Sequence, residues 1–300
     1  MNALRLPLRR AVAQPGAPLV NPWAALALPV LVFLVVCFLL PLIVMGLRAV
    51  TDLPDGAEGD VLANFRRFFE GEANVRVLGN TFWVAALSTL TCLAIGYPYA
   101  YLMTVASPRW TGILLIAVLV PFWSSLLVRT YAWQVILRDT GLINSTLIGW
   151  GLIAEPLDLY QTTTAVILGM THVLLPFMVL PLFTTMSRID PELTKAAANL
   201  GATPTRAFMR VFLPLSVPGI LSGSLLVFVL ALGFYITPAL LGSPKDTMLS
   251  AFIATRVQQQ LDWGLASAMA LVLIGVTLGV LFAASRVIRV RDVFGALESD

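Results

Sequence analysis

Six long apolar runs limit what this chain can fold into. They cover about residues 23–48, 78–104, 111–137, 162–186, 215–241 and 264–287. Each run exceeds the roughly 20 residues that an α-helix needs to cross the hydrocarbon core of a bilayer. Only 12% of the residues are charged, whereas about a quarter of a soluble domain is charged. The sequence therefore predicts an all-α integral membrane protein with six transmembrane helices.

Proline and glycine positions predict irregularities within these helices. Pro29 and Pro41 predict kinks in the first helix, and Gly96 with Pro98 predicts a break near the end of the second. The apolar run behind the basic segment 1–22 is too long for a cleaved signal peptide, so we expect an uncleaved first helix. The sequence from Phe65 to Phe69, FRRFF, predicts a short interfacial helix before the second span.

Two pairs of glycines have the spacing that permits close helix packing in lipid. Gly219 and Gly223 lie in the fifth predicted span, and Gly275 and Gly279 lie in the sixth. Such pairs let two helix backbones approach each other. The motif is common in glycine-rich membrane helices, so each pair indicates packing only weakly.

Basic residues are distributed unequally between the two sides of the membrane. An even number of spans places both termini on one side. If that side is the cytoplasm, the inner segments hold 11 of the 19 basic residues and 5 of the 16 acidic ones. Because cytoplasmic loops carry an excess of Lys and Arg, we predict cytoplasmic termini. The predicted organisation is an N-terminal cytoplasmic segment, 1–22, followed by one transmembrane domain, 23–300.

The loop 188–214 is the longest polar interval in the second half of the chain, and it predicts two short helices. Asp190 and Thr203 are the expected N-caps, and a proline follows each at the first helical position. Gly201 is the expected stop of the first helix. Four apolar residues of that helix share one face; they are Leu193, Ala196, Ala197 and Leu200. Another protein can approach this small face closely, although a solvated connector would show the same pattern.

Loop 188–214 also resembles the EAA loop of ABC importer permeases, which has a Glu-Ala-Ala triplet, a glycine at fixed spacing and an Ile-x-Leu-Pro tail. The matching residues are Lys195, Ala196, Ala197, Gly201, Val211, Leu213 and Pro214. Lys195 replaces the usual Glu, and Val211 replaces Ile. The resemblance implies the type I importer permease fold, in which this loop is a coupling helix that docks into a cytoplasmic ATPase. Lys195 would then pair with an acidic residue of the ATPase or point to water.

Three further stretches, 121–133, 233–253 and 262–270, resemble the spermidine/putrescine permease subfamily. The resemblance implies a permease in the bacterial inner membrane, assembled with a second and usually non-identical permease, two ATPase subunits and a periplasmic solute-binding protein. It also implies a small organic solute, with a polyamine such as spermidine or putrescine as the expected one. The alternative is a secondary transporter driven by an ion gradient, which predicts mid-membrane carboxylates and inverted repeats. Neither is visible in the sequence.

The sequence predicts no catalytic, metal or cofactor site. No G-x-x-x-x-G-K-[ST] pattern occurs, so we expect a separate subunit to hydrolyse ATP and this chain not to be an enzyme. The single histidine and the two cysteines, which lie in apolar runs, do not form a ligand pattern. The net charge of +3 comes without a basic cluster on a soluble domain, so nucleic acid is not an expected partner.

Arg129 and His172 are the ionisable residues within the predicted spans that are candidates for transport. Arg129 either serves the path or reaches the outer interface beside Tyr131 and Trp133, and His172 either serves the path or is a neutral core residue. Aromatic rings offer weak cation–π contacts to an amine, or they only pack. The predicted path residues are Trp123, Arg129, Tyr131, His172 and Tyr235. No Asp or Glu lies in a predicted span, so we expect this chain to bind solute weakly.

Overall fold

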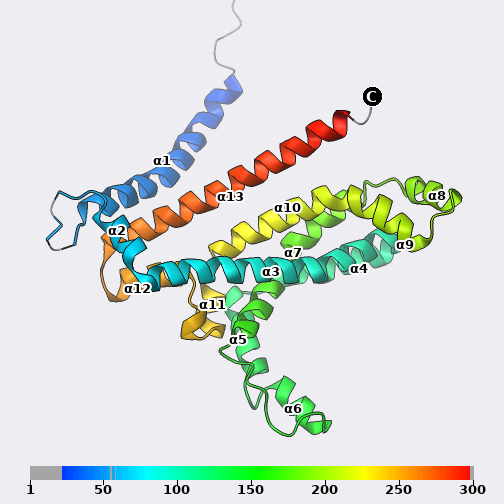
Figure 1. Ribbon diagram of the computed structural model, residues 1–300, viewed down its shortest axis with the longest axis horizontal. Helices are drawn as coiled ribbons and strands as arrows, with labels where there is room; N and C mark the ends of the chain where they lie inside the picture. The colour runs from blue at the N-terminus through cyan, green and yellow to red at the C-terminus, as the bar shows by residue number, and fades with distance from the viewer. Residues whose placement is uncertain (1–21, 55, 58, 298–300) are drawn as a thin grey trace, which may run out of the picture. The chain divides into compact units, whose positions relative to one another are not determined.

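The structure, a computed structural model, describes residues 22–54, 56–57 and 59–297, with side chains between residues 27 and 286. The described residues form helices and no β-strand (Figure 1), as the apolar runs predict. The helices are α1 Pro22–Thr51, α2 Ala63–Glu70, α3 Glu72–Val105, α4 Pro108–Leu119, η1 Val120–Trp123, α5 Leu126–Leu137, α6 Leu142–Gly149, α7 Thr163–Met186, α8 Pro191–Asn199, α9 Pro204–Ala207, η2 Phe208–Phe212, α10 Leu213–Leu232, α11 Ile236–Leu241, η3 Pro244–Asp246, α12 Leu249–Gln259 and α13 Trp263–Leu297. The predicted segment 1–22 lies outside the described residues, apart from Pro22.

The described helices carry the predicted spans. Five of them are long and apolar enough to cross a membrane: Ala27–Thr51, Glu72–Val105, Thr163–Met186, Pro204–Leu232 and Trp263–Arg286. The bent pair Pro108–Trp123 and Leu126–Gly149 makes six when it counts as one span. The chain divides into two units, residues 1–47 and 48–300. The first contains most of α1, and everything below concerns the second.

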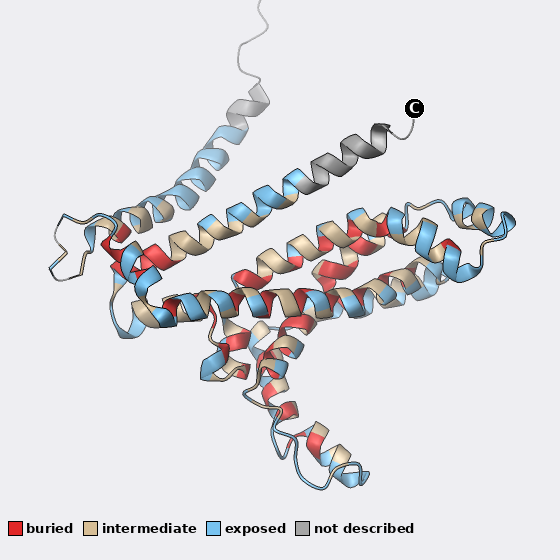
Figure 2. Ribbon diagram, viewed as in Figure 1, coloured by how far each residue is buried: buried red, intermediate tan, exposed pale blue. Residues whose placement is uncertain are grey.

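Helices α3, α7 and α10 form the core of the second unit, and we call them the three-helix core. They lie side by side (Figure 1), and their buried faces meet (Figure 2). A Cβ added at Gly219 would lie 2.8 Å from the Cβ of Thr185, and one added at Gly223 would lie 3.0 Å from the sulfur of Met178. Close packing is therefore confirmed for the first glycine pair.

The second glycine pair does not pack within the described part of this chain. A Cβ added at Gly275 or at Gly279 would meet no atom within 4 Å. The same spacing therefore marks a contact in α10 and an open surface in α13.

The prediction of one continuous third span, 111–137, is wrong. The chain is extended at Ser124 and Ser125, and the two halves of the span are bent by 99°. Pro121 lacks a backbone N–H, and a proline followed by serines is a known cause of sharp bends. The span is therefore α4 and η1, then a break, then α5.

The predicted break at Gly96 and Pro98 is also wrong, because α3 is continuous from Glu72 to Val105. Tight packing on α7 explains why the helix continues: a Cβ on Gly96 would lie 3.0 Å from the side chain of Met178. Tertiary contacts here outweigh the single hydrogen bond that a proline removes.

The predicted fifth span, 215–241, starts earlier and ends earlier than expected. The second helix of loop 188–214 does not end near Leu213 but continues through α9 and η2 into α10, which ends at Leu232. Short helix α11 follows separately. A continuous helix would bring the ring of Pro238 against the carbonyl of Phe234, which accounts for this break.

Three other boundaries differ from the sequence-based expectation. The segment 138–160, expected as a loop, contains α6, and the polar segment 242–263 contains α12. The last helix, α13, runs to Leu297 instead of ending at Val287. Helices α6 and α12 and the end of α13 lie outside the long apolar runs, which is why hydropathy alone did not indicate them.

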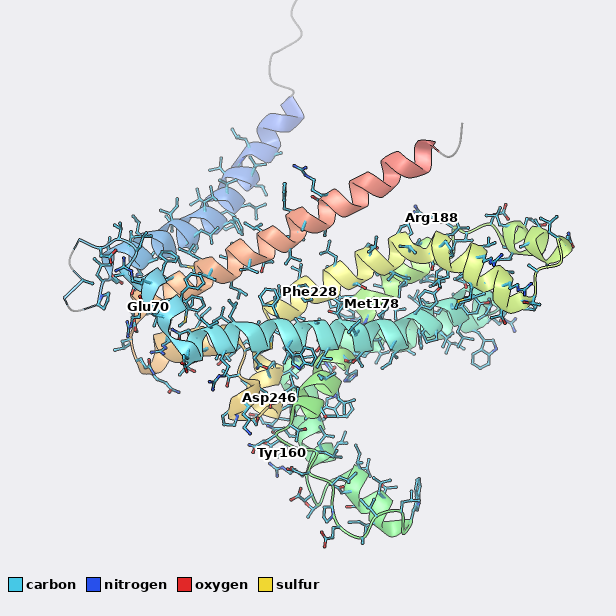
Figure 3. The ribbon with its side chains drawn as sticks, viewed as in Figure 1. Glu70, Tyr160, Met178, Arg188, Phe228 and Asp246 are labelled. Atoms are coloured by element: carbon cyan, nitrogen blue, oxygen red, sulfur yellow. The ribbon has the colours of Figure 1, made fainter. Side chains whose placement is uncertain are left out.

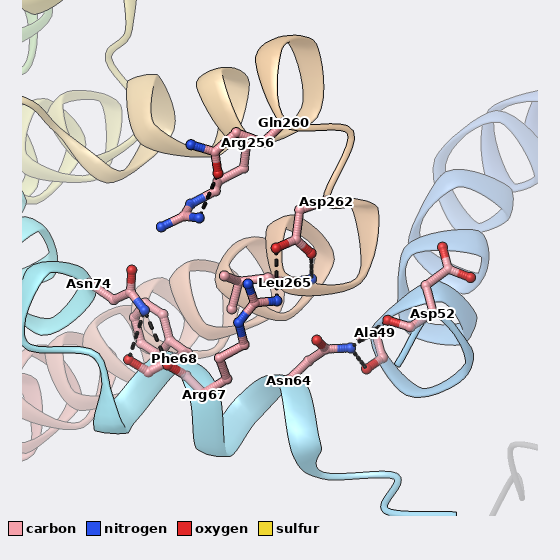
Figure 4. Close-up of polar contacts among 10 residues, drawn as sticks. All are labelled: Ala49, Asp52, Asn64, Arg67, Phe68, Asn74, Arg256, Gln260, Asp262 and Leu265. Atoms are coloured by element: carbon pink, nitrogen blue, oxygen red, sulfur yellow. Dashed lines mark hydrogen bonds and ion pairs between the residues drawn. The ribbon is translucent and has the colours of Figure 1, made fainter. Parts of the chain in front are cut away.

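The predicted helix over Phe65–Phe69 is confirmed as α2, which is anchored by polar contacts (Figure 4). The side-chain amide of Asn64 donates to the carbonyls of Ala49 and Asp52, at 2.9 and 3.0 Å. Arg67 forms an ion pair of 2.8 Å with Asp262, which precedes α13. These contacts join α2 to the end of α1 and to the start of α13.

Candidate functional site

Helix α8 of loop 188–214 has the predicted caps. The carboxylate of Asp190 accepts a hydrogen bond of 2.9 Å from the N–H of Glu192. At the other end Gly201 has φ of +87°. The N–H of Gly201 donates to the carbonyl of Ala198, and the N–H of Ala202 donates to the carbonyl of Ala197. These two hydrogen bonds form a Schellman motif. Glycine is favoured at this position because a Cβ is strained at positive φ.

No residue of α8 is buried in the structure (Figure 2). Leu193 is 47% exposed and Leu200 is 90% exposed, and Ala197 lies between them on the same face. An apolar face on an exposed helix is the usual surface for docking into another protein's groove. The face predicted from spacing is therefore present and uncovered.

Lys195 has a partner that the sequence reading did not identify. Its ammonium lies 2.8 Å from a carboxylate oxygen of Glu192 on the same helix, and both side chains are exposed. This hydrogen bond and the negative charge of Glu192 raise the pKa of the Lys195 ammonium. Lys195 therefore stays protonated at neutral pH. Its positive charge is offset by the carboxylate of Glu192, one turn from the cap at Asp190.

Helices α9 and α10 are joined by a π-helical turn, η2, within the motif that ends in Val211, Leu213 and Pro214. The N–H of Leu213 bonds to the carbonyl five residues earlier, at Phe208. Pro214 lacks an N–H and would clash with the carbonyl of Arg210 in a regular helix, and the wider turn relieves this conflict. Single π turns in helices occur frequently at functional positions.

Aromatic rings attach this π turn to the three-helix core. The ring of Tyr101 in α3 lies 5.4 Å from Phe208 and 5.1 Å from Phe212, centroid to centroid. The hydroxyls of Tyr97 and Ser216 hydrogen-bond at 3.0 Å, between α3 and α10. Motion of loop 188–214 is therefore connected to α3 through these side chains.

The predicted path residues Trp123 and Arg129 lie on the two sides of the break at Ser124. Trp123 is 82% exposed. The guanidinium of Arg129 donates to the carbonyl of Ser124 at 3.2 Å, and its Nε is buried with no hydrogen-bond partner. Arg129 thus uses one of its N–H groups to bond a backbone carbonyl exposed by the break, while its Nε–H makes no hydrogen bond within the described residues.

His172 of α7 contacts helix α5, which also carries Arg129, through the side chain of Trp133. The indole N–H of Trp133 donates to Nδ1 of His172 at 3.1 Å. Trp133 is one turn beyond Arg129 on α5, so both side chains lie on one face of that helix. Because Nδ1 accepts a hydrogen bond, His172 is neutral here, which supports its reading as a hydrogen-bonded residue of the helix interface.

Tyr131 and Tyr235 are both exposed, at 54% and 41%. Tyr131 lies in α5, and Tyr235 directly precedes α11. A hydrogen bond of 3.4 Å between the hydroxyls of Thr130 and Thr237 joins these two helices. Gln134 adds a bond of 2.7 Å to the carbonyl of Leu240. The structure therefore connects Arg129 and His172 to α5, whereas Trp123, Tyr131 and Tyr235 are exposed.

One buried carboxylate was missed by the sequence reading. Asp246 is 3% exposed and accepts hydrogen bonds from the hydroxyl of Thr163 and from the N–H and hydroxyl of Ser243 (Figure 3). It lies in η3, outside the long helices, and the Ser-x-x-Asp spacing of a capping box is the signal that would have indicated it. Ser124 was also missed, although Pro121 and the following serines signalled the break. Trp133 was expected only as an interfacial neighbour of Arg129, and its hydrogen bond to His172 was not predicted.

Comparisons with known proteins agree with this architecture. Residues 22–294 match the family model described as binding-protein-dependent transport system inner membrane component. The chain is 37% identical over 196 residues to the spermidine/putrescine transport system permease protein PotB of Haemophilus influenzae, which covers 65% of this chain and 68% of that protein. The Escherichia coli K12 protein of the same name is 35% identical, covering 71% of this chain and 78% of its own length.

A more distant relative is the putative 2-aminoethylphosphonate transport system permease protein PhnU of Salmonella typhimurium LT2. It is 28% identical and covers 87% of this chain and 90% of its own. Among solved structures, a chain of a bacterial alginate ABC transporter in complex with a periplasmic protein superposes with a TM-score of 0.70 at 19% identity. It covers 88% of this chain and 92% of that chain, and it shows the same fold.

Proposed function

This chain belongs to the family of inner-membrane components of binding-protein-dependent transport systems, and on that premise we propose that it is the permease subunit of an ATP-driven importer for a small organic amine. The structure provides five apolar helices and a bent pair for a multi-pass inner-membrane protein. Membership of this family supports an ATP-driven importer over the alternative of an ion-driven secondary transporter.

A polyamine such as spermidine or putrescine is the proposed solute. The relatives at 35–37% identity are named for spermidine and putrescine, and the more distant relative is named for 2-aminoethylphosphonate. These solutes share a primary amine. The amine is therefore the feature that the proposal assigns to the solute, with polyamines as the preferred members of the class.

Loop 188–214 is the proposed contact with the ATPase, and the observation that carries this step is the exposed apolar face of α8. The face is present on a well-capped helix that buries no residue of its own. The proposed coupling residues are Lys195, Ala196, Ala197, Gly201, Val211, Leu213 and Pro214. In the proposed assembly, two copies of the ATPase dock on this chain and on a second, non-identical permease.

The proposed path runs beside α5, with Trp123, Arg129, Tyr131, His172 and Tyr235 as the candidate residues. Arg129 offers a cation and the aromatic rings offer only weak attraction to an amine. Tight recognition is therefore assigned to a periplasmic binding protein, while the permease holds the solute loosely. Calorimetry that found tight amine binding to the permeases without the binding protein would contradict this assignment.

The central experiment is transport by the purified complex in proteoliposomes. Uptake of labelled spermidine should require ATP, the ATPase and the binding protein together. A complex of the same composition that transports no amine would refute the proposed solute class. Dilution of the binding protein should lower the uptake, because the permease alone does not collect solute.

The proposed topology places both termini and loop 188–214 in the cytoplasm. Thr203 is exposed, and a Thr203→Cys variant in a background without Cys37 and Cys92 tests this placement. An impermeant maleimide should label it only from the cytoplasmic side. Labelling of intact cells from outside would overturn the orientation.

A further inference from the structure

The strongest unassigned feature is a groove of about 430 Å³ between α7 and α10, in the half of α7 that ends at loop 188–214. The described residues that line it include no charged side chain. Their polar side chains are the hydroxyls of Thr184, Thr185 and Ser222, and the rest of the wall is apolar. A groove of this size and composition can hold part of a small solute, and without a charge it holds a cation only loosely.

Two of these hydroxyls are arranged as hydrogen-bond acceptors. The hydroxyl of Thr184 donates to the carbonyl of Leu180 at 2.8 Å, and that of Ser222 donates to the carbonyl of Pro218 at 2.9 Å. A hydroxyl has one proton and two lone pairs, so both oxygens are left to accept. Both side chains are exposed, whereas the hydroxyl of Thr185 packs against α10 itself.

A backbone carbonyl adds a third acceptor. Pro181 has no N–H, so the carbonyl of Phe177, four residues earlier, lacks its usual helical donor. Both residues line the groove. A carbonyl without a donor is costly against lipid tails, and it is satisfied where the N–H of a solute or a water molecule reaches it. The groove therefore favours a polar occupant over a lipid chain.

The groove on the other side of α10 is different and provides a comparison. It lies between α3, α10 and α13, and its surface is almost entirely apolar. Ser224 lines it, two residues beyond Ser222. Two residues along an α-helix turn by about 200°, so these serines lie on opposite sides of α10 and form a matched pair for experiments.

The groove between α7 and α10 continues the proposed path from α5 towards the cytoplasm. The rings of Phe122, beside the break in the third span, and Phe177 lie 5.2 Å apart, centroid to centroid. At the other end, Thr184 also lines a neighbouring pocket together with Arg188 and Asp190. The two charges there are opposite, as are the partial charges of the ends of α7 and α8. Selection of a cation is therefore left to the acceptors in the groove.

We propose that this groove is the cytoplasmic half of the solute path, and that Thr184, Ser222 and the Phe177 carbonyl accept hydrogen bonds from ammonium groups of the passing solute. The inference rests on the proposed function, because it requires an amine solute. An ammonium group has N–H donors and no acceptor, so it matches these three oxygens. Conduction requires binding sites that are weak enough to release the solute, and neutral acceptors meet this requirement.

Cysteine chemistry tests the surface independently of uptake. The complete complex without Cys37 and Cys92 is kept turning over ATP, so that each conformation is sampled. A Ser222→Cys variant should react with cationic and anionic water-soluble methanethiosulfonate reagents. After each rate is divided by that of free cysteine, the cationic reagent should be faster about two-fold or more, as one hydrogen bond produces. Ser224→Cys should react much more slowly with both, because a thiol in apolar surroundings stays protonated.

Removal of a hydroxyl tests the contact with the solute. Thr184→Val nearly keeps the shape of the side chain but has no acceptor. It should lower the maximal rate of spermidine uptake into proteoliposomes about two- to ten-fold, the range expected for one hydrogen bond. The ATPase rate and the half-saturating concentration of loaded binding protein should not change, because the solute reaches the groove after the binding protein has docked. Thr184→Ser should restore uptake, and Ser224→Ala should have no effect.

The two experiments separate this inference from the proposed function. Slow reaction of Ser222→Cys with both reagents would assign the groove to a lipid or to a partner helix and would overturn the inference. Equal normalised rates, or a faster anionic reagent, would remove the preference for amines and would overturn it too. Normal uptake by Thr184→Val, in a complex that imports spermidine, would overturn it while leaving the proposed function intact. An unmodified complex that imports no amine fails the proposed function instead.

Discussion

The α7–α10 interface and helix α8 differ in how tightly they pack against the rest of the chain. At the interface, Gly219 and Gly223 bring two backbones so close that an added Cβ would overlap or crowd α7. Helix α8 buries nothing and is held by its caps and by short connections to α9 and η2. The comparison indicates a rigid core that transmits motion as a unit and an attached loop that is free to dock and move.

The largest effect is expected from overfilling the rigid region. A Gly223→Leu variant places a side chain where the sulfur of Met178 already lies 3.0 Å away from the Cβ position. Overpacking of this kind costs about 1–3 kcal/mol or more, so we expect loss of folded protein in detergent and a lower unfolding temperature. Fluorescence-detected size exclusion and thermal unfolding measure both.

The second glycine pair supplies the control for this substitution. Gly279 has no atom within 4 Å of its Cβ position. A Gly279→Leu variant should therefore fold with the stability of the unmodified chain. Equal destabilisation at both positions would mean that the α7–α10 contact is not what distinguishes them.

The second prediction concerns Gly201 in the exposed loop. Its φ is +87° with open space around it, so Gly201→Val strains the backbone by about 1 kcal/mol or more without a clash. The end of α8 and the face that includes Leu200 should then be displaced. We expect the protein to insert normally but transport and ATPase stimulation to fall about ten-fold, as 1.4 kcal/mol of lost coupling produces.

Gly151 offers a matched control because its φ is +71° and its Cβ position is also open. It lies in the segment after α6, outside loop 188–214. Gly151→Val carries a similar local strain and should leave ATPase stimulation unchanged. A Gly201→Val complex that transports normally would end the coupling role of α8.

The sequence predicted most of what depends on composition and local chemistry. The presence of the long apolar helices, the caps at Asp190 and Thr203 and the stop at Gly201 follow from apolar runs and side-chain hydrogen bonding, and the structure has them. These features are local, so a single sequence contains the information that specifies them.

Features that depend on distant partners were less predictable. Whether α3 breaks near Pro98 is decided by the packing of Gly96 against Met178 of α7. Whether a glycine pair packs is decided by which helix lies opposite. The pairing of Trp133 with His172 joins residues 39 positions apart, and no pattern in one sequence indicates such a contact. For Asp246, the local spacing from Ser243 could have indicated the capping box, but its contact with Thr163 could not be predicted, because Thr163 belongs to another helix.

A smaller effect is expected at the joint between the two regions. The hydrogen bond between Tyr97 and Ser216 connects α3 to the start of α10. Such bonds between membrane helices contribute about 0.6 kcal/mol on average. Tyr97→Phe and Ser216→Ala should each lower stability by about this amount, and the double variant should lose less than the sum of the two, as a double-mutant cycle of unfolding free energies will measure. Strict additivity would mean that the hydroxyls do not interact.

The smallest effect is expected at Lys195, although this position departs from the EAA pattern. Its ammonium is exposed and already paired with Glu192 on the same helix. Reversal of the charge in Lys195→Glu places two carboxylates three residues apart, which slightly disfavours α8, but it leaves the caps and the Leu193, Ala197 and Leu200 face in place. ATPase activity should therefore change less than about two-fold, as is usual for an exposed charge, and Lys195→Gln should match it. A large loss in Lys195→Glu with normal activity in Lys195→Gln would show instead that this position faces an acidic residue of the ATPase, and that the exposed loop is specified by charge as well as by its apolar face.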